Sequence, residues 1–202
     1  IVVINPNNPT GALYPKEILE KIVDLARKHE LMIFADEIYD RLVLDGKTHT
    51  SIASLAPDLF VVTFNGLSKS HRIAGFRSGW MVLSGDLSKA KGYIEGVNML
   101  SSMRLCANVP AQHVIAPALR NRPEVDDLLL PGGRIYEQRK VICDAIAEID
   151  GLSAVTPEAA FYIFPKIDAK RFHILDDEKF ALDLLRENHV LLVHGRGCNG
   201  EA

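Results

Sequence analysis

Cysteine is scarce in this chain, and its cysteines are poorly placed for cross-linking or metal binding. Among 202 residues there are three, Cys106, Cys143 and Cys198, without CxxC spacing. An odd number of distant cysteines supports neither a disulfide framework nor a zinc site, so we expect reduced, buried thiols. The seven histidines form no HxH or HExxH pattern, and we assign no metal ion.

Long apolar runs and blocks of like charge are also lacking. No apolar run approaches the length that crosses a bilayer, and the first residues resemble neither a basic leader nor a cleavage site. The net charge of −3 is not concentrated in one block, which gives no electrostatic reason to expect nucleic acid or a membrane as partner. We expect a cytoplasmic protein that binds small molecules.

What the chain does contain is enough apolar sequence for a substantial core, arranged as alternating strands and helices. Apolar residues make up 48% of the chain and charged residues 24%. Short apolar runs at 1–4, 31–35 and 59–64 predict strands buried on both faces, and an apolar stripe after Pro15 predicts a helix. This order is typical of an α/β fold with a mostly parallel sheet and flanking helices.

Further elements follow with the same kind of signal. Residues 80–83 predict another strand, and the later patterns predict helices at 87–103, 109–119, 134–149 and 179–188 and strands at 161–164 and 190–193. Helix breakers at 121–133 predict a hinge between part of a large domain, 1–120, and part of a smaller α+β domain, 134–202. The chain starts without Met, inside a predicted strand, and we expect it to be a fragment.

Polar side chains follow three of the predicted strands. The segment 5–11 follows the first strand, Asp36 and Tyr39 follow the second, and Ser68 and Lys69 follow the third. In an open parallel sheet, ligands bind outside the carboxyl ends of the strands. We therefore expect these segments to share one crevice.

The residue types in this crevice match the needs of a pyridine aldehyde that carries a phosphate. A lysine at the end of a buried strand can lose its proton and form a Schiff base, which suits Lys69. Asp36 can pair with a pyridinium nitrogen, and Tyr39 can hydrogen-bond a ring oxygen.

The remaining polar groups suit the other parts of such a ligand. Asn8 has an amide that can reach the ring oxygen or a substrate carboxylate, and Ser68 and Arg77 can hold a phosphate.

Each residue also has a purely structural alternative. Asn-Pro and Thr-Gly pairs commonly form turns, and Asp36 can cap a helix that begins at Glu37. Tyr39 can belong to the core, Arg77 can form an ion pair, and Lys69 taken alone is most simply a surface charge. The conjunction of these residues, in this order, favours the functional interpretation.

The motifs resemble those of a known family. The chain has Asn-Pro-Asn-Asn-Pro-Thr-Gly at 5–11, Asp-Glu-Ile-Tyr at 36–39, and Ser-Lys at 68–69 followed by Gly-Phe-Arg-Ser-Gly-Trp at 75–80. Together they resemble the class I/II aminotransferases, fold-type I enzymes that depend on pyridoxal 5′-phosphate. The stretches 64–69 and 103–113 are most similar to the bacterial glutamate-pyruvate (alanine) transaminase branch.

The resemblance implies a role for each site residue. Lys69 would be the Schiff-base lysine and proton shuttle, Asp36 the partner of the pyridine nitrogen, and Tyr39 the partner of the ring oxygen. Asn8 would contact that oxygen and the substrate carboxylate, and Arg77 and Ser68 would bind the phosphate. Tyr162 resembles a substrate-side residue, although Ala159 stands where relatives often have glycine.

Family members are considerably longer than this chain. Their N-terminal part supplies a ring-stacking aromatic and further phosphate donors, and their C-terminal part supplies an arginine for the substrate carboxylate, a role we do not give to Arg196. The resemblance implies a homodimeric parent that moves an amino group between an amino acid, alanine or glutamate, and a 2-oxo acid, with the fragment inactive alone. The alternatives are a lyase or decarboxylase of the same fold, or a non-catalytic regulatory module.

Overall fold

The chain divides into two compact units in the computed structural model, which describes residues 1–120 and 123–198. The first unit comprises Ile1–Arg139 with Pro157–Tyr162, and the second comprises Lys140–Thr156 with Ile163–Ala202. The domain limits expected around a hinge at 121–133 stay a prediction, and residues 121–122 of that hinge lie outside the described ranges.

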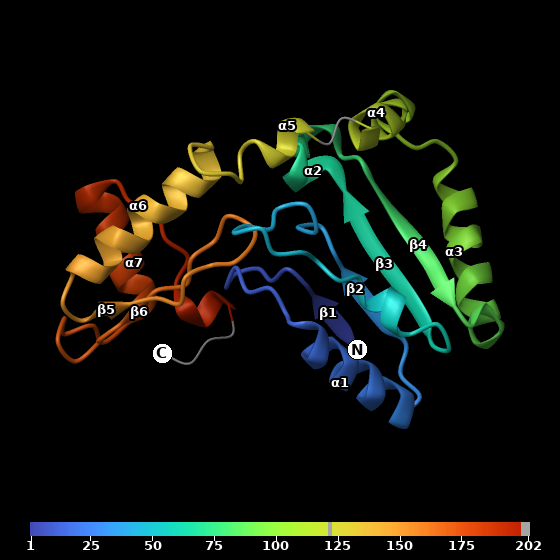
Figure 1. Ribbon diagram of the computed structural model, residues 1–202, viewed down its shortest axis with the longest axis horizontal. Helices are drawn as coiled ribbons and strands as arrows, with labels where there is room; N and C mark the ends of the chain where they lie inside the picture. The colour runs from blue at the N-terminus through green and yellow to red at the C-terminus, as the bar shows by residue number, and fades with distance from the viewer. Residues whose placement is uncertain (121–122, 199–202) are drawn as a thin grey trace. The chain divides into compact units, whose positions relative to one another are not determined.

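The first unit is built on a four-stranded sheet (Figure 1). Its strands are β1 (Val2–Ile4), β2 (Ile33–Asp36), β3 (Phe60–Gly66) and β4 (Gly79–Gly85), in that order. β1, β2 and β3 run parallel, and β4 is antiparallel to β3. Ile4 pairs with Asp36, and Asp36 pairs with Phe64, so the three parallel strands reach the same level at their carboxyl ends. The predicted mostly parallel α/β sheet is confirmed.

Apolar side chains cover both faces of the sheet at its middle strands, β2 and β3. Helix α1 (Lys16–Lys28) buries Leu19 and Val23 against one face, where Ile33 and Val61 also lie. Alternate strand residues point to the opposite face. There Phe34, Phe60 and Val62 pack with Ala90 and Tyr93, at the start of α3 (Lys91–Arg104). Strands covered in this way read as continuous apolar runs, which explains the sequence pattern.

Short helices connect and extend the sheet. They are α2 (Leu67–Ser70), α4 (Val109–Arg120), α5 (Pro123–Asp126) and α6 (Arg134–Glu148), with 3₁₀ turns at Ile52–Leu55, Ala74–Phe76 and Leu87–Ala90. Val125 and Leu129 are buried in one cluster with Tyr39. Arg139 of α6 makes a two-pronged ion pair with Asp45, both bonds 2.6 Å long. These contacts hold residues 123–139 to the first unit.

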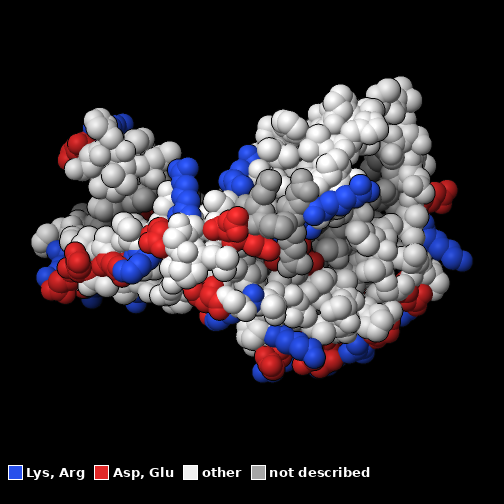
Figure 2. All heavy atoms as spheres, turned by 45° about the horizontal axis from the view of Figure 1, so that its top comes forward, with Lys and Arg blue, Asp and Glu red and all other residues white. Residues whose placement is uncertain are grey.

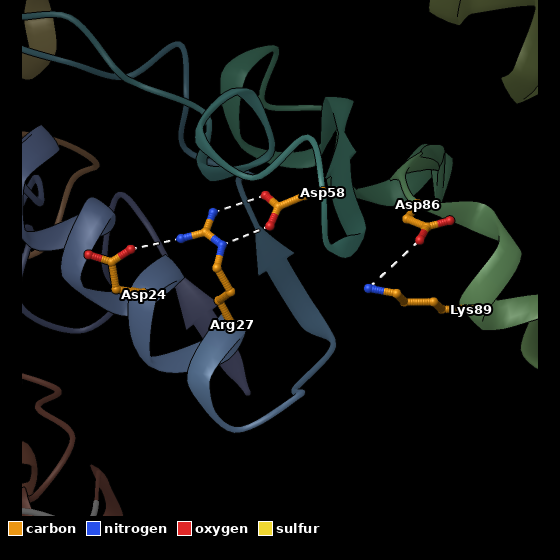
Figure 3. A network of polar contacts seen from close by, with 5 residues as sticks. All are labelled: Asp24, Arg27, Asp58, Asp86 and Lys89. Carbon is orange, nitrogen blue, oxygen red and sulfur yellow. Dashed lines mark hydrogen bonds and ion pairs between the residues drawn. The ribbon is translucent and has the colours of Figure 1, made fainter.

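A surface ion pair links α1 to the turn before β3 (Figure 3). Asp58 accepts hydrogen bonds of 2.7 and 2.9 Å from the Arg27 guanidinium, which also donates to Asp24 at 2.7 Å. The hydrogen bond from Arg27 lowers the pKa of Asp58 to about 2. The figure also shows the ion pair of Lys89 and Asp86 at the next 3₁₀ turn. The Lys89 Nζ lies 3.7 Å from the Asp86 Oδ2. Because water screens these groups, they fix local geometry more than they stabilise the fold.

The second unit is smaller. It contains the last turns of α6, a two-stranded antiparallel sheet of β5 (Leu152–Ser153) and β6 (Lys166–Ile167), helix α7 (Asp177–Asn188) and a 3₁₀ turn at Gly195–Cys198. Asp176 caps α7 by accepting a 3.0 Å hydrogen bond from the Lys179 amide.

Two predicted strands are wrong. At 161–164 the chain turns instead, because Ala160 adopts a left-handed conformation (φ 57°) and its amide donates to the Leu42 carbonyl. At 190–193 the four side chains are 43–76% exposed, and no strand within the described ranges pairs with them. An apolar run forms a strand only where another strand is placed to pair with it.

The expectation of buried thiols is also wrong for the two cysteines that can be assessed. Cys106 is exposed and Cys143 is half-buried, and both are free. The side chain of Cys198 lies outside the described residues. Cys106 follows α3, a helix without a single buried residue, and shares the exposure of that helix.

The face of the molecule drawn in Figure 2 shows no field of one sign. Acidic and basic side chains are intermingled on the face drawn in Figure 2. Over residues 1–120 and 123–198, we find no helix with the length and apolarity needed to cross a membrane. In the same ranges, His, Cys, Asp and Glu side chains form no group of three or more able to hold a metal ion.

We predict that Leu19→Ala destabilises the first unit by about 2–5 kcal/mol, because it leaves a cavity between α1 and the sheet. Leu25→Ala, on the same helix but 52% exposed, is the control and is expected to cost less than about 1 kcal/mol. Urea unfolding measures both values. Equal effects would contradict the assignment of the core face.

Candidate functional site

A cavity of about 410 Å³ lies at the carboxyl ends of the parallel strands, within the first unit. This volume is typical of small-molecule sites. Six of the seven predicted site residues line it, namely Asn8, Asp36, Tyr39, Ser68, Lys69 and Arg77. The other lining residues are Asn65 and the apolar Ile4, Ile38, Phe64 and Ala74. The strand ends therefore meet in one crevice.

The first loop holds Asn8 at this crevice through its own hydrogen bonds. The Asn7 side-chain oxygen accepts from the amide and the hydroxyl of Thr10, at 3.3 and 2.7 Å. The Asn5 amide donates to the Asp36 carbonyl at 3.1 Å, which joins the loop to the end of β2. The turn expected from Asn-Pro and Thr-Gly pairs is present, and it is the turn that presents Asn8.

Asp36 ends β2 and does not cap a helix. Its Oδ1 accepts a 3.1 Å hydrogen bond from the Ile38 amide, which forms a turn over residues 37–41. The half-buried carboxylate has no ion-pair partner among residues 1–120 and 123–198. A carboxylate in this position is suited to a cationic ligand group.

Tyr39 belongs to the core and to the cavity wall at once. It is 2% exposed, and its hydroxyl lies 2.5 Å from the Tyr162 hydroxyl. Burial raises the pKa of Tyr39, and the hydrogen bond with Tyr162 raises it further. A hydrogen bond from Asn8 acts in the opposite direction. The phenol therefore keeps its proton at neutral pH.

Lys69 lies in α2, the single helical turn that follows β3. Its Nζ is 6.0 Å from the centroid of the Tyr39 ring, and it has no ion pair within the described ranges. Gly66 allows the close approach of the chain at Ser78, since a Cβ there would lie 2.9 Å from the Ser78 carbonyl oxygen. Ser68, one residue before the lysine, also reaches the cavity.

Arg77 approaches from the turn between α2 and β4. It adopts a left-handed conformation (φ 51°), and its Nη1 donates to the Ala74 carbonyl at 2.9 Å. The alternative of a structural ion pair finds no acidic partner in the part of the chain that is described. Its guanidinium is suited to an anion in the cavity.

Tyr162 lies behind the cavity wall and not in it. Its ring packs edge-on against Tyr39, with 5.5 Å between centroids. The segment 157–162 is held in the first unit because the amides of Glu158 and Ala159 both donate to the Gly11 carbonyl at 3.0 Å. The substrate contact expected for Tyr162 stays a prediction, and the contact that the structure shows is with Tyr39.

Two residues close to the predicted ones in sequence were not anticipated, one in the cavity lining and one outside it. Asn65 lines the cavity, and its position at the end of β3 was a signal that could have indicated it. Glu37 is 6% exposed and accepts a hydrogen bond from the Ile52 amide at 3.2 Å. Burial raises its pKa to about 7, with neighbouring Asp40 and Asp36 adding to the effect. Sequence alone cannot indicate the burial that causes this shift.

We predict that Glu37 makes the fold less stable as pH rises. An acid with a raised pKa in the folded state stabilises the fold fully below its unfolded pKa of 4.5, and this contribution is lost as pH passes about 7. Glu37→Gln keeps an acceptor for the Ile52 amide and has no titrating carboxyl. It therefore removes the loss of folding free energy with rising pH, which amounts to at most about 3 kcal/mol.

Urea unfolding at about pH 5 and about pH 8 tests this prediction. From pH 5 to pH 8, the free energy of unfolding of Glu37→Gln should rise relative to that of the wild type. Glu95→Gln, on the exposed face of α3, should show no such relative rise. A parallel pH dependence of wild type and Glu37→Gln would contradict it.

Comparisons with known proteins identify the family. A family model described as aminotransferase class I and II matches residues 1–200. The chain is 59% identical over 199 residues to glutamate-pyruvate aminotransferase AlaA of Haemophilus influenzae, covering 98% of this chain and 49% of that protein. It is 51% identical over 202 residues to an alanine aminotransferase of Mycobacterium tuberculosis, covering 100% and 47%.

Solved structures agree. An aminotransferase from Escherichia coli has a TM-score of 0.96 at 60% identity, covering 98% of this chain and 49% of that one. An alanine aminotransferase from Pyrococcus furiosus has a TM-score of 0.90 at 40% identity, with the same coverage. The chain thus spans about half the length of the relatives it matches. It belongs to the class I and II aminotransferases, a family of fold type I whose cofactor is pyridoxal 5′-phosphate.

Proposed function

We propose that this chain is the cofactor-binding part of a longer aminotransferase, which moves an amino group between an amino acid and a 2-oxo acid. The observation that carries the proposal is the convergence of Lys69, Asp36, Tyr39 and Asn8 on one cavity. The relatives named for glutamate, pyruvate and alanine support alanine or glutamate as the amino donor.

The groups in the cavity fit pyridoxal phosphate chemically. When bound, the cofactor supplies an aldehyde that takes up an amino group and a ring that accepts electrons. Lys69 provides the amine for covalent attachment, and the carboxylate of Asp36, which lacks a cationic partner within the described ranges, suits a protonated ring nitrogen. Arg77 and Ser68 provide donors for the phosphate.

The same residues can orient the substrate and move protons. Asn8 and Tyr39 line the cavity and would hold the ring oxygen of the bound cofactor. The Lys69 Nζ would act as the base that takes the proton from the α-carbon of the substrate and as the acid that returns it. One lysine therefore serves in attachment and in proton transfer.

The active parent is proposed to be a cytoplasmic homodimer, with this half-length chain inactive alone. Helix α3 supports the proposal of a longer, dimeric parent, in which further protein would cover this helix. The helix has no buried residue and exposes Met99, Leu100 and Met103 by 60–73%. Contiguous apolar exposure of this kind marks an interaction surface.

We predict that Lys69→Ala abolishes covalent cofactor attachment in a parent protein of the relatives' length. Borohydride reduction of the loaded protein followed by peptide mass spectrometry should place the cofactor on Lys69 in the wild type and nowhere in the variant. Amino transfer should fall by at least about 10²–10⁴-fold, the range for loss of a general acid–base group. Lys91→Ala, an exposed lysine of α3, is the control. Covalent cofactor retained in Lys69→Ala would refute the assignment.

The reaction class needs a separate measurement. With alanine and 2-oxoglutarate, the parent should yield pyruvate and glutamate in equal amounts. Pyruvate with free ammonia would indicate a lyase instead, and cofactor binding without turnover would indicate a regulatory module.

A further inference from the structure

Tyr39 and Tyr162 form a hydrogen-bonded pair beside the cavity. The proposed function gives a role to Tyr39 and none to Tyr162. Their hydroxyl oxygens are 2.5 Å apart, and either oxygen can be the donor. Tyr39 lines the cavity and Tyr162 does not. Any effect of the Tyr162 hydroxyl on a ligand in the cavity therefore passes through Tyr39.

The hydrogen bonds that the Tyr39 hydroxyl accepts determine where it can donate its own proton. A phenol has one proton to donate and two positions at which it accepts. The Tyr162 hydroxyl is the partner that lies within hydrogen-bond distance of the Tyr39 hydroxyl. If Tyr162 donates this bond, the proton of Tyr39 is left for an acceptor in the cavity that Tyr39 lines.

The geometry points to Tyr162 as a positioning residue, which donates its hydroxyl proton to the Tyr39 oxygen and so turns the Tyr39 proton toward the ring oxygen of the bound cofactor. This inference rests on the proposed function, since that oxygen belongs to pyridoxal phosphate. Without an acceptor in the cavity the shared bond can run the other way. If the direction of this hydrogen bond reverses, Tyr39 becomes the donor and Tyr162 the acceptor, and both hydroxyls keep their protons.

The surrounding structure holds the two hydroxyls in place. Gly11 has a left-handed conformation (φ 68°) and lies so close to the segment 157–162 that a Cβ would come within 2.6 Å of Pro157. The Ala160 amide donates to the Leu42 carbonyl at 2.7 Å, which fixes the other side of the segment. The short hydroxyl contact is thus built into the scaffold. Donors fixed before binding need no reorganisation.

A direct substrate contact by Tyr162 would behave differently. It would change the KM for the amino acid and leave the loaded protein unaltered when substrate is absent. A donor that points at the ring oxygen favours the form of the cofactor with more negative charge on that oxygen. It therefore lowers the pH at which the visible absorption of the bound cofactor is halfway through its change, here called the pH midpoint. The absorption of the substrate-free protein therefore separates the two roles.

The test compares variants of a parent protein of the relatives' length, loaded with pyridoxal phosphate. Tyr162→Phe keeps the ring that packs on Tyr39 and removes only the hydroxyl. We expect it to raise the pH midpoint by roughly half a unit to one unit, the equivalent of one hydrogen bond. Tyr39→Phe should raise it at least as much, and the double variant should match Tyr39→Phe alone, because Tyr162 acts only through Tyr39.

The control is Tyr136→Phe. Tyr136 packs against the same buried cluster and contacts Arg139 through its ring, while its hydroxyl has no hydrogen-bond partner in the described ranges. Its midpoint should equal that of the wild type. Circular dichroism checks that each variant is folded, and 3-fluorotyrosine at position 162, a stronger donor that keeps the ring, should lower the midpoint.

The outcomes are distinguishable. An unmoved midpoint in folded Tyr162→Phe, or additive shifts in the double variant, overturns the positioning role while the proposed function stands. A raised KM for the amino acid with an unmoved midpoint assigns Tyr162 to the substrate instead. A wild-type parent that binds no pyridoxal phosphate overturns both.

Discussion

The register of the three parallel strands is the constraint on which the site depends. Ile4, Asp36 and Phe64 are paired across β1, β2 and β3, so the residues that follow each strand emerge side by side. A slip of one residue in β2 would turn Asp36 to the opposite face of the sheet. Register is set by apolar side chains on two covered faces, which means that packing far from the cavity determines where its polar groups lie.

This dependence explains why so much of the arrangement was predictable. Continuous apolar runs indicate buried parallel strands, and polar residues at their ends indicate a shared crevice. Asn8, Asp36, Ser68 and Lys69 could therefore be brought together without a structure. The residue types matched a pyridine aldehyde that carries a phosphate, and the resemblance of the motifs to a family supplied the class of reaction.

The features that escaped prediction depend on long-range contacts. Glu37 has an unusual pKa because other segments bury it, and no local pattern encodes that burial. Residues 161–164 have a strand-like composition, yet hydrogen bonds to Gly11 and Leu42 hold the preceding residues in a turn. At 190–193 the apolar run is exposed, so composition and burial disagree. At 161–164, local propensity yields to tertiary context.

The contact between Tyr39 and Tyr162 has a consequence for the order in which the chain acquires its structure. The two residues are 123 positions apart, so their bond closes a loop that contains most of the chain. Such contacts form late, because the entropy of loop closure must be overcome before they contribute. The hydrogen-bonding pattern of the crevice therefore needs the segment 157–162 as well as the strand ends, although that segment lies far along the chain.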